Sequence, residues 1–383
     1  MRITLVIYAV WGGGAERAAS LLANCWTEQG HEVSVLTFEE QDGVRYPIAT
    51  SVKVRHLDLF RQSRNFREGL FHNLRRIRVL RRAIRESRPD VVISFGCAIN
   101  ILTVLATRQL GLRVVIRETA DPLEHRVGTI WGVLRRLLYP LADMLVCPNS
   151  ACLAKVQTIT KVPGTVIPNL VFGPPMVKQS QRVGWGAGHQ LVAMGRLVRE
   201  KGFDFLLAAF SLIASQNPDW SLTIIGKGPL RSELEQRSIA LKLAGRVHFA
   251  GELADPFPVL CAADLFVFSS RYETFGNALA EAMACGLPVV SFDCPDGPRT
   301  IVRHGIDGIL VPARDVSALA AALNRLMSDP GERVRLGARA REVTVRFSSG
   351  RILSLWQNLF AQLVPSEAPF QWVPDELPFH AKQ

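Results

Sequence analysis

Two glycine-containing segments of this 383-residue chain have the residue types of phosphate-binding loops. In the first, Gly12-Gly13-Gly14 precedes a helix expected to begin near Ala15, so backbone N–H groups and the helix dipole could bind an anion. In the second, the segment 195–202, Arg196 and Lys201 supply the guanidinium fork and the point charge that suit a diphosphate. The structural alternative for the first segment is a tight turn without a ligand. For the second it is a charge pair exposed to solvent.

A third segment places two carboxylates around the start of a helix. Glu273 precedes the expected helix and Glu281 lies about two turns inside it, so one ligand could be held at two points. The backbone N–H groups of Phe275, Gly276 and Asn277 would be the unpaired donors of the helix start, available to phosphate oxygens or sugar hydroxyls. The structural alternative is that Glu273 only caps the helix.

Other motifs are missing from the sequence. It contains no Gly-x-Gly-x-x-Gly and no Walker sequence, so the dinucleotide and P-loop fingerprints fail. The seven cysteines have neither a regular framework nor the spacing of a zinc site. They predict free thiols in a reducing compartment.

Strand-like apolar runs alternate with helical patterns and must position these segments. We expect strands at 3–9, 32–38, 91–95, 114–116, 144–147 and 166–167 in the first half, and at 191–195, 222–226, 247–251, 265–269, 288–292 and 308–311 in the second. This alternation predicts an α/β fold with two mostly parallel sheets. We expect a first domain at 1–170, a linker at 171–189, a second domain at 190–347, a helix at 348–364 and a loosely ordered tail at 365–383.

Together these segments resemble the retaining family 4 group of the GT-B nucleotide-sugar glycosyltransferases. The resemblance covers nearly the whole chain, with its motifs at 12–17, 195–202, 224–229, 270–290 and 305–312. The segment 293–298 further resembles an amylovoran-type subset that builds surface polysaccharides and lipid-linked oligosaccharides. The resemblance to the family implies two Rossmann-like domains facing across a cleft, the first binding the acceptor and the second binding the nucleotide sugar.

The resemblance also implies roles for individual residues. Arg196 and Lys201 would hold the donor diphosphate, and the backbone of Gly13 and Gly14 would close on its β-phosphate. Glu281 would bind the ribose hydroxyls, and Glu273 would bind a hydroxyl of the sugar. Thr274 stands where many relatives have Gly or Pro, which leaves the donor sugar open.

The implied reaction moves a hexose or N-acetylhexosamine, with retention, from a UDP- or GDP-sugar to a polyprenyl-linked or other membrane-associated glycan. UDP is the expected nucleotide, and no protein nucleophile is nominated. Because no Asp-x-Asp occurs in the sequence, we expect no metal; we also expect no cofactor, since the nucleotide sugar is a substrate. On the acceptor side, Glu118 and His125 follow a first-half strand and are candidates for orienting the attacking hydroxyl. The alternative for His125 is simple solvation.

The net charge of +11 is concentrated in one segment. Arg61–Arg88 contains ten arginines and two glutamates, which is a net +8. The apolar residues within it recur at three- and four-residue spacing, at Phe71, Leu74, Ile77, Leu80 and Ile84. The pattern predicts an amphipathic cationic helix that docks on an anionic membrane or packs its stripe inward, and both can hold.

The expected location is cytoplasmic, peripherally associated with the inner face of the plasma membrane. No apolar run reaches 18 residues, and we interpret residues 3–9 as a buried strand rather than as a signal sequence. Other hypotheses are a GT-B epimerase, a phosphorylase whose lysine signature is missing, and a nucleic-acid-binding protein. Apart from Phe66 and Phe71, the Arg-rich segment lacks interleaved aromatic residues, so we expect no nucleic acid.

Overall fold

The structure is a computed structural model that describes residues 1–39, 46–59, 66–124, 127–174 and 188–364. It divides into two compact units. The first unit contains Met1–Leu170 and Trp356–Val364, and the second contains Val171–Leu355. Most of the predicted linker, at 175–187, and all of the predicted tail lie outside the described residues.

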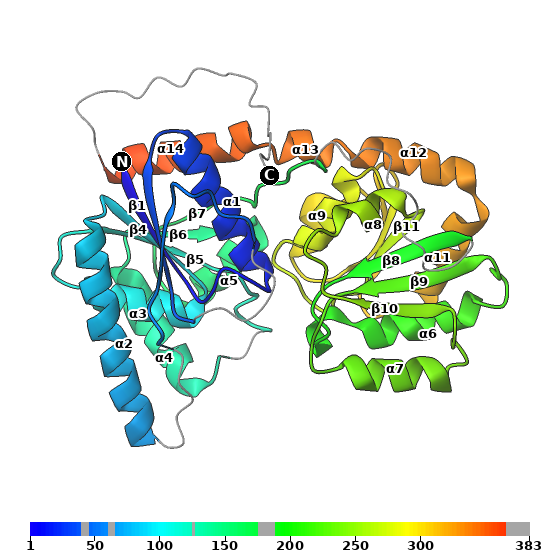
Figure 1. Cartoon of the computed structure of the whole chain (residues 1–383), viewed down its shortest axis with the longest axis horizontal. Helices are drawn as coiled ribbons and strands as arrows, with labels where there is room; N and C mark the ends of the chain where they lie inside the picture. Colours follow the sequence, from blue (N-terminus) through cyan, green and yellow to red (C-terminus); the bar gives the residue numbers. More distant parts are fainter. Residues whose placement is uncertain (40–45, 60–65, 125–126, 175–187, 365–383) are drawn as a thin grey trace. The chain divides into compact units, whose positions relative to one another are not determined.

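A seven-stranded parallel sheet forms the centre of the first unit (Figure 1). Its strands have the order β3-β2-β1-β4-β5-β6-β7. They are β1 (Arg2–Ile7), β2 (Glu32–Thr37), β3 (Lys53–His56), β4 (Val91–Phe95), β5 (Arg113–Arg117), β6 (Met144–Cys147) and β7 (Gly164–Val166). The inner strands are continuous apolar runs because helices cover both of their faces.

The helices of the first unit are divided between the two faces of this sheet. One face shares its core clusters with α2 (Phe66–Ser87), α3 (Cys97–Thr107), α4 (Thr129–Leu138) and α5 (Ser150–Ile159). A short 3-10 turn, η1 (Tyr139–Leu141), follows α4. The helix α1 (Gly14–Glu28) joins β1 to β2 in the opposite direction across the sheet, and a right-handed crossover therefore places it on the other face.

The second unit has a six-stranded parallel sheet of order β10-β9-β8-β11-β12-β13. The strands are β8 (His189–Met194), β9 (Trp220–Ile225), β10 (Val247–Gly251), β11 (Leu265–Phe268), β12 (Val289–Asp293) and β13 (Ile309–Pro312). A large core cluster joins one face to α6 (Phe203–Ile213), α7 (Arg231–Ala240) and α11 (Val316–Ser328). Against β11 and β12 packs α9 (Asn277–Ala284), which also contacts α8 (Phe257–Ala262), α10 (Gly297–Ile301), α12 (Pro330–Ala340) and α13 (Val343–Arg346).

The predicted α/β class with two parallel sheets is confirmed. The sequence did not predict β3, because three of its four side chains are exposed and it has no apolar run. It pairs in parallel with β2 at the edge of the sheet.

The last helix, α14 (Ser349–Leu363), has its second half in the first unit. Its Trp356 packs edge-on against Trp26 of α1, with ring centroids 5.3 Å apart, and Phe360 lies 5.5 Å from the same ring. The guanidinium of the buried Arg117 lies 5.5 Å from the centre of the Trp356 ring, and burial lowers the pKa of Arg117 to about 10. Its Nη2 donates to the backbone oxygen of Ile167 and to Asn169 Oδ1, so α14 is held by aromatic packing and by a buried cation.

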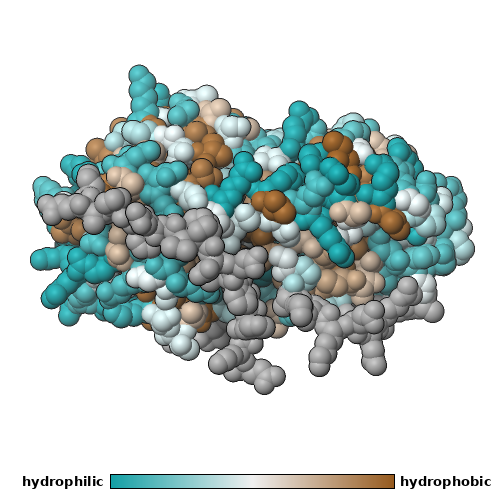
Figure 2. Space-filling model, turned by 90° about the horizontal axis from the view of Figure 1, so that it is seen from above, coloured by the Kyte–Doolittle hydropathy of each residue, from teal (hydrophilic) through white to brown (hydrophobic). Residues whose placement is uncertain are grey.

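On the face drawn in Figure 2, hydrophilic residues predominate and hydrophobic residues form small separate patches. Among the described residues, no helix has both the length and the apolar character needed to cross a membrane. All seven cysteines are free thiols, as predicted, and five of them are buried.

Candidate functional site

The motif segments of the second unit follow four neighbouring strands. Residues 195–202 follow β8, 226–230 follow β9, 269–276 follow β11 and 294–297 follow β12. Because these strands are parallel and adjacent, the segments lie at the same edge of the sheet, where open α/β folds bind their ligands.

Glycines allow these loops to approach one another closely. A Cβ on Gly202, which has φ +64°, would lie 2.0 Å from the backbone oxygen of Ser269. A Cβ on Gly226 would lie 2.0 Å from the backbone oxygen of Gly195. The loop after β8 therefore contacts both of its neighbours through backbone, and only glycine fits at these two positions.

The predicted cations of this edge differ in their surroundings. Lys201 Nζ forms an ion pair with Glu273 Oε2, and the side chains of Lys201 and Glu273 are 22% and 19% exposed. The ammonium of Lys201 also lies 5.8 Å from the centre of the Phe268 ring. The Arg196 side chain is exposed and makes no hydrogen bond or ion pair within the described part of the chain. The structure thus brings Lys201 and Glu273 together and leaves Arg196 accessible to an anion.

Arg271 is a residue of this site that the sequence analysis did not single out. Its two terminal nitrogens donate to both carboxylate oxygens of Asp204 at 2.7 and 2.6 Å, and its guanidinium lies 4.1 Å from the centre of the Phe205 ring. Burial raises the pKa of Asp204, but the hydrogen bonds and charge of Arg271 outweigh it, and the pKa is lowered. The Glu273 loop is therefore fixed to the start of α6.

The helix α9 begins where the sequence predicts. Gly276 precedes it with φ +105°, and no side chain caps the first turn. The side chain of Phe275 is buried and packs edge-on against Phe347, so this residue offers a ligand only its backbone. Glu281 lies in the second turn and is 9% exposed.

The segment after β12 packs on the loop that carries Glu273. Asp296 forms a short parallel bridge with Glu273 and has an unusual φ of +78°. A Cβ on Gly297 would lie 2.7 Å from the backbone oxygens of both Glu273 and Phe275. The 293–298 motif therefore supports the backbone that presents the Glu273 carboxylate.

In the first unit, the glycine-rich turn leads directly into α1. The helix begins at Gly14, Gly13 is its N-cap in an extended conformation, and no side chain caps it. A Cβ on Gly13 would lie 2.1 Å from Oε2 of Glu16, so the Glu16 carboxylate already lies over this turn. A phosphate group at Gly13 and Gly14 would have to displace that carboxylate.

The two acceptor-side candidates have different outcomes. Glu118 is buried and accepts a 2.6 Å hydrogen bond from the Tyr139 hydroxyl, which also accepts one from Asn100 Nδ2 at 3.1 Å. Burial raises the pKa of Glu118, and the Tyr139 hydrogen bond opposes that shift only in part. Glu118 therefore lies inside its domain, where its carboxylate is hydrogen-bonded to the buried Tyr139. His125 lies outside the described residues.

Comparisons with known proteins identify the family and the fold of this chain. The model of the glycosyl transferase 4-like domain matches residues 13–169, and the model of glycosyl transferases group 1 matches residues 188–329. The crystal structure of Anabaena HepE, in complex with UDP and glucose, aligns over 94% of this chain and 99% of that chain with a TM-score of 0.76 at 20% identity. That likeness shows the fold.

A relative in Rhizobium meliloti decides the family. LpsD, a lipopolysaccharide core biosynthesis glycosyltransferase, is 30% identical over 76% of this chain and 82% of its own length. This chain belongs to family 4 of the GT-B glycosyltransferases.

Two further relatives of this family 4 glycosyltransferase act on or build glycans according to their names. A Campylobacter jejuni protein, named as an α-1,4-N-acetylgalactosaminyltransferase acting on an undecaprenol-diphosphate-linked glycan, is 28% identical over 95% of this chain and 99% of its own length. An exopolysaccharide phosphotransferase of Streptomyces coelicolor is 30% identical over 95% of this chain, which spans 41% of that longer protein.

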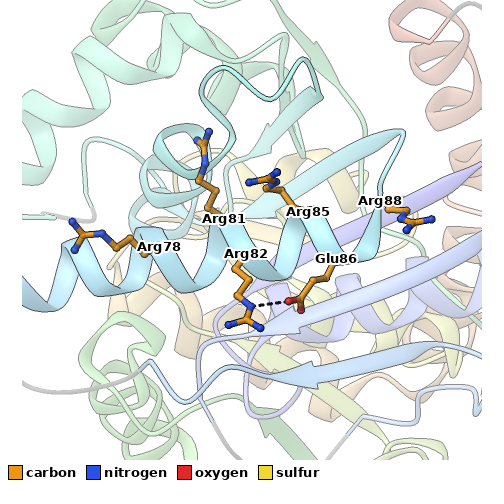
Figure 3. A pocket seen from close by; sticks show the side chains of 6 residues that line it. All are labelled: Arg78, Arg81, Arg82, Arg85, Glu86 and Arg88. Carbon is orange, nitrogen blue, oxygen red and sulfur yellow. Dashed lines mark hydrogen bonds and ion pairs between the residues drawn. The ribbon is translucent and has the colours of Figure 1, made fainter.

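The arginine-rich helix of this glycosyltransferase, α2, is divided along its length. Toward its C-terminal end Leu80 and Ile84 are fully buried, whereas near its start Phe71 is 65% and Leu74 is 43% exposed. The apolar stripe therefore packs inward at one end only. A hollow of about 620 Å³ on this helix is lined by Arg78, Arg81, Arg82, Arg85, Glu86 and Arg88 (Figure 3).

Among the described residues that line this hollow, Glu86 is the one carboxylate. Glu86 pairs with Arg82 at 2.8 Å, the contact drawn in Figure 3, and also with Arg55. Arg61 and Arg64 of the predicted basic segment lie outside the described residues. Within the described part of the chain, no cluster of three or more His, Cys, Asp or Glu side chains is placed to hold a metal ion.

Proposed function

We propose that this chain is a retaining glycosyltransferase that moves a hexose or N-acetylhexosamine from a nucleotide diphosphate sugar, a UDP-sugar, to a membrane-associated glycan. The acceptor is a polyprenyl-linked glycan in cell-surface polysaccharide biosynthesis. The observation that carries the proposal is the Lys201–Glu273 ion pair at the ligand-binding edge of the second sheet, in the same loop as the accessible Arg196. The UDP complex of the Anabaena neighbour supports the choice of nucleotide.

In this proposal the donor diphosphate binds the accessible guanidinium of Arg196 and the ammonium of Lys201. Lys201 already pairs with Glu273, so an arriving diphosphate shares that ammonium and leaves the Glu273 carboxylate able to accept a hydrogen bond from a sugar hydroxyl. Glu281 binds the ribose hydroxyls, and the first turn of α9, with Phe275, Gly276 and Asn277, offers backbone N–H donors. Gly13 and Gly14, at the uncapped start of α1, are the proposed further N–H donors to the β-phosphate, which would have to displace the Glu16 carboxylate.

In the proposed reaction, negative charge develops on the leaving nucleoside diphosphate. Breaking the bond between the anomeric carbon and the phosphate oxygen leaves negative charge on the nucleoside diphosphate, and fixed cations and N–H donors stabilise it. For the retaining course, the acceptor hydroxyl attacks from the face that the diphosphate leaves, and a departing phosphate oxygen takes its proton. No protein nucleophile, metal or cofactor takes part in the proposed reaction.

On the acceptor side, the name of the Campylobacter relative supports a polyprenyl-diphosphate-linked glycan. His125 is the proposed residue for orienting the attacking hydroxyl, and His125→Ala should lower turnover. Glu118 acts as a positioning residue, since its carboxylate is bonded to Tyr139 inside the domain. Unchanged turnover in His125→Ala would remove that residue from the mechanism.

The same proposal places the protein at the inner face of the plasma membrane, with Arg61–Arg88 directed at anionic lipid. The arginine-lined hollow on α2 supports this, because each basic residue near an anionic surface contributes about 1 kcal/mol of attraction. The protein should co-sediment with anionic vesicles at low salt and remain in the supernatant at high salt. Co-sedimentation that does not depend on salt concentration would contradict the electrostatic attachment.

A donor screen tests the proposed reaction. UDP- and GDP-sugars are compared by thermal shift and by hydrolysis of the donor, with wild type, Arg196→Ala and Glu281→Ala. A bound donor at 100 times its Kd stabilises the folded protein by about 2.7 kcal/mol, and both variants should lose much of that shift. Wild type that no nucleotide sugar stabilises would contradict the proposal.

A further inference from the structure

The helix α4 has a second apolar face that the rest of the described structure does not cover. Ile130, Val133 and Leu137 are 59%, 54% and 62% exposed. Leu141, just beyond the helix, is 46% exposed. The spacing of three, four and four residues puts these side chains on one side of the helix. Four large aliphatic side chains therefore form one continuous outward stripe.

The opposite side of α4 is already fully used. Leu134 and Leu138 pack against a core cluster that contains the buried Tyr139. Trp131 packs against that cluster and also against the one that contains Leu80 of α2. The inward face of α4 is therefore filled, and the outward stripe is not a core surface that a small rotation of the helix could bury.

Neither α4 nor the turn that follows it contains an acidic residue. Residues 127–142 contain no Asp or Glu, and Arg136 is exposed beside Leu137. In Figure 1 α2, α3 and α4 lie on the same side of the first sheet, and α3 contacts both of the others. The exposed end of α2 adds Phe71 and Leu74 together with the exposed Arg75 and Arg78.

We propose that α4, together with the exposed first half of α2, is a surface that inserts into an anionic lipid bilayer. The stripe of α4 enters the boundary between headgroups and acyl chains, while the arginines of α2 bind lipid phosphates. A bilayer supplies both an apolar layer and anionic groups. A second copy of this chain would instead bring two cationic surfaces together, which like-charge repulsion opposes. This inference rests on the proposed function for its membrane acceptor and adds a second, apolar point of attachment.

The test removes the stripe and keeps the charge. Ile130→Gln/Val133→Gln/Leu137→Gln is compared with wild type in co-sedimentation with phosphatidylglycerol–phosphatidylcholine vesicles and in the maximum insertion pressure of a lipid monolayer. The matched control is Ile239→Gln/Val334→Gln/Val345→Gln, at side chains that are 65%, 74% and 72% exposed in the second unit. Circular dichroism and thermal unfolding establish that all three proteins are folded.

The stripe variant should bind vesicles about tenfold or more weakly and insert at a lower pressure, because three apolar side chains no longer leave water. The control should behave as wild type. Equal binding and insertion pressure in the stripe variant and wild type would overturn the proposal, as would a wild-type dimer that the stripe variant abolishes. UDP titration of the same proteins separates the two hypotheses: wild type that binds vesicles but no nucleotide overturns the proposed function and leaves this surface standing.

Discussion

Gly202 gives the sharpest structural test of the donor loop. Gly202 directly follows Lys201, and Gly202→Ala adds a Cβ 2.0 Å from the backbone oxygen of Ser269. Gly245→Ala is a matched control, because Gly245 also has a left-handed φ, +74° against +64°, but nothing within 4 Å of its added Cβ. Both variants bear the same kind of backbone strain, and only one displaces the loop.

The two effects have different magnitudes. A left-handed alanine costs about 1–2 kcal/mol relative to glycine, so both variants should lose about that much stability. At Gly202 the added Cβ must also move at least about 1 Å from the Ser269 oxygen to reach an ordinary contact. A displacement of about 1 Å in a positioning group can cost about 100-fold in turnover. Lys201 and Glu273 lie on the two loops that must separate.

Donor hydrolysis and UDP titration measure this difference. Gly202→Ala should lose about 100-fold in kcat/KM for donor hydrolysis and bind UDP more weakly, whereas Gly245→Ala should keep both near wild type. Urea unfolding of each variant establishes the shared strain. If Gly202→Ala binds UDP and hydrolyses donor as well as Gly245→Ala does, the loop contact with Ser269 does not position the site, and our reasoning fails.

Three further predictions follow from the described contacts. Burial raises the pKa of Glu118, so the contribution of its protonated form to stability is largest below the unfolded pKa of about 4.3 and falls as pH rises. The free energy of unfolding of Glu118→Gln relative to wild type should therefore grow from pH 4 to pH 8 in urea titrations. A difference between the two proteins that does not change with pH would refute this. Trp356→Ala should lower the free energy of unfolding by about 3–5 kcal/mol in denaturant titrations, since the ring is fully buried against Trp26; a loss under about 1 kcal/mol would contradict that packing. Arg271→Ala should lower the free energy of unfolding by about 1–3 kcal/mol in denaturant titrations, since Asp204 loses both hydrogen bonds. The same variant should bind UDP more weakly in calorimetric titration. Unchanged UDP affinity would show that Arg271 does not support the donor loop.

The inner strands of the sheets were predictable because they are continuous apolar runs. Val91–Phe95 and Met144–Cys147 are inner strands with the predicted bounds, and the half-buried edge strand Val247–Gly251 also has its predicted bounds. The edge strand β3 was missed because pairing with β2, not burial, defines it. Whether α2 is buried could not be predicted for a related reason. Spacing shows that an apolar stripe exists, but packing against α3 and the first sheet determines which end of the stripe is covered.

The predicted binding segments meet at one edge because parallel strands bring their carboxyl ends together. Contacts between distant residues could not be predicted in this way. Lys201 and Glu273 are 72 residues apart, and Arg271 and Asp204 are 67 apart, so no local pattern links either pair. Glu118 was selected because it follows a strand, yet Tyr139 from a later element holds it inside the domain.

The central claim is that the second unit binds a nucleotide diphosphate through Arg196 and Lys201. The most direct measurement is calorimetric titration of UDP into wild type, Arg196→Ala, Lys201→Ala and Arg237→Ala, the last being a control that removes one exposed charge from α7. We predict that wild type and Arg237→Ala bind UDP alike and that the two loop variants lose about tenfold or more in affinity, since charge-assisted hydrogen bonds contribute about 1.5–3 kcal/mol. Equal affinity in all four proteins would contradict the claim.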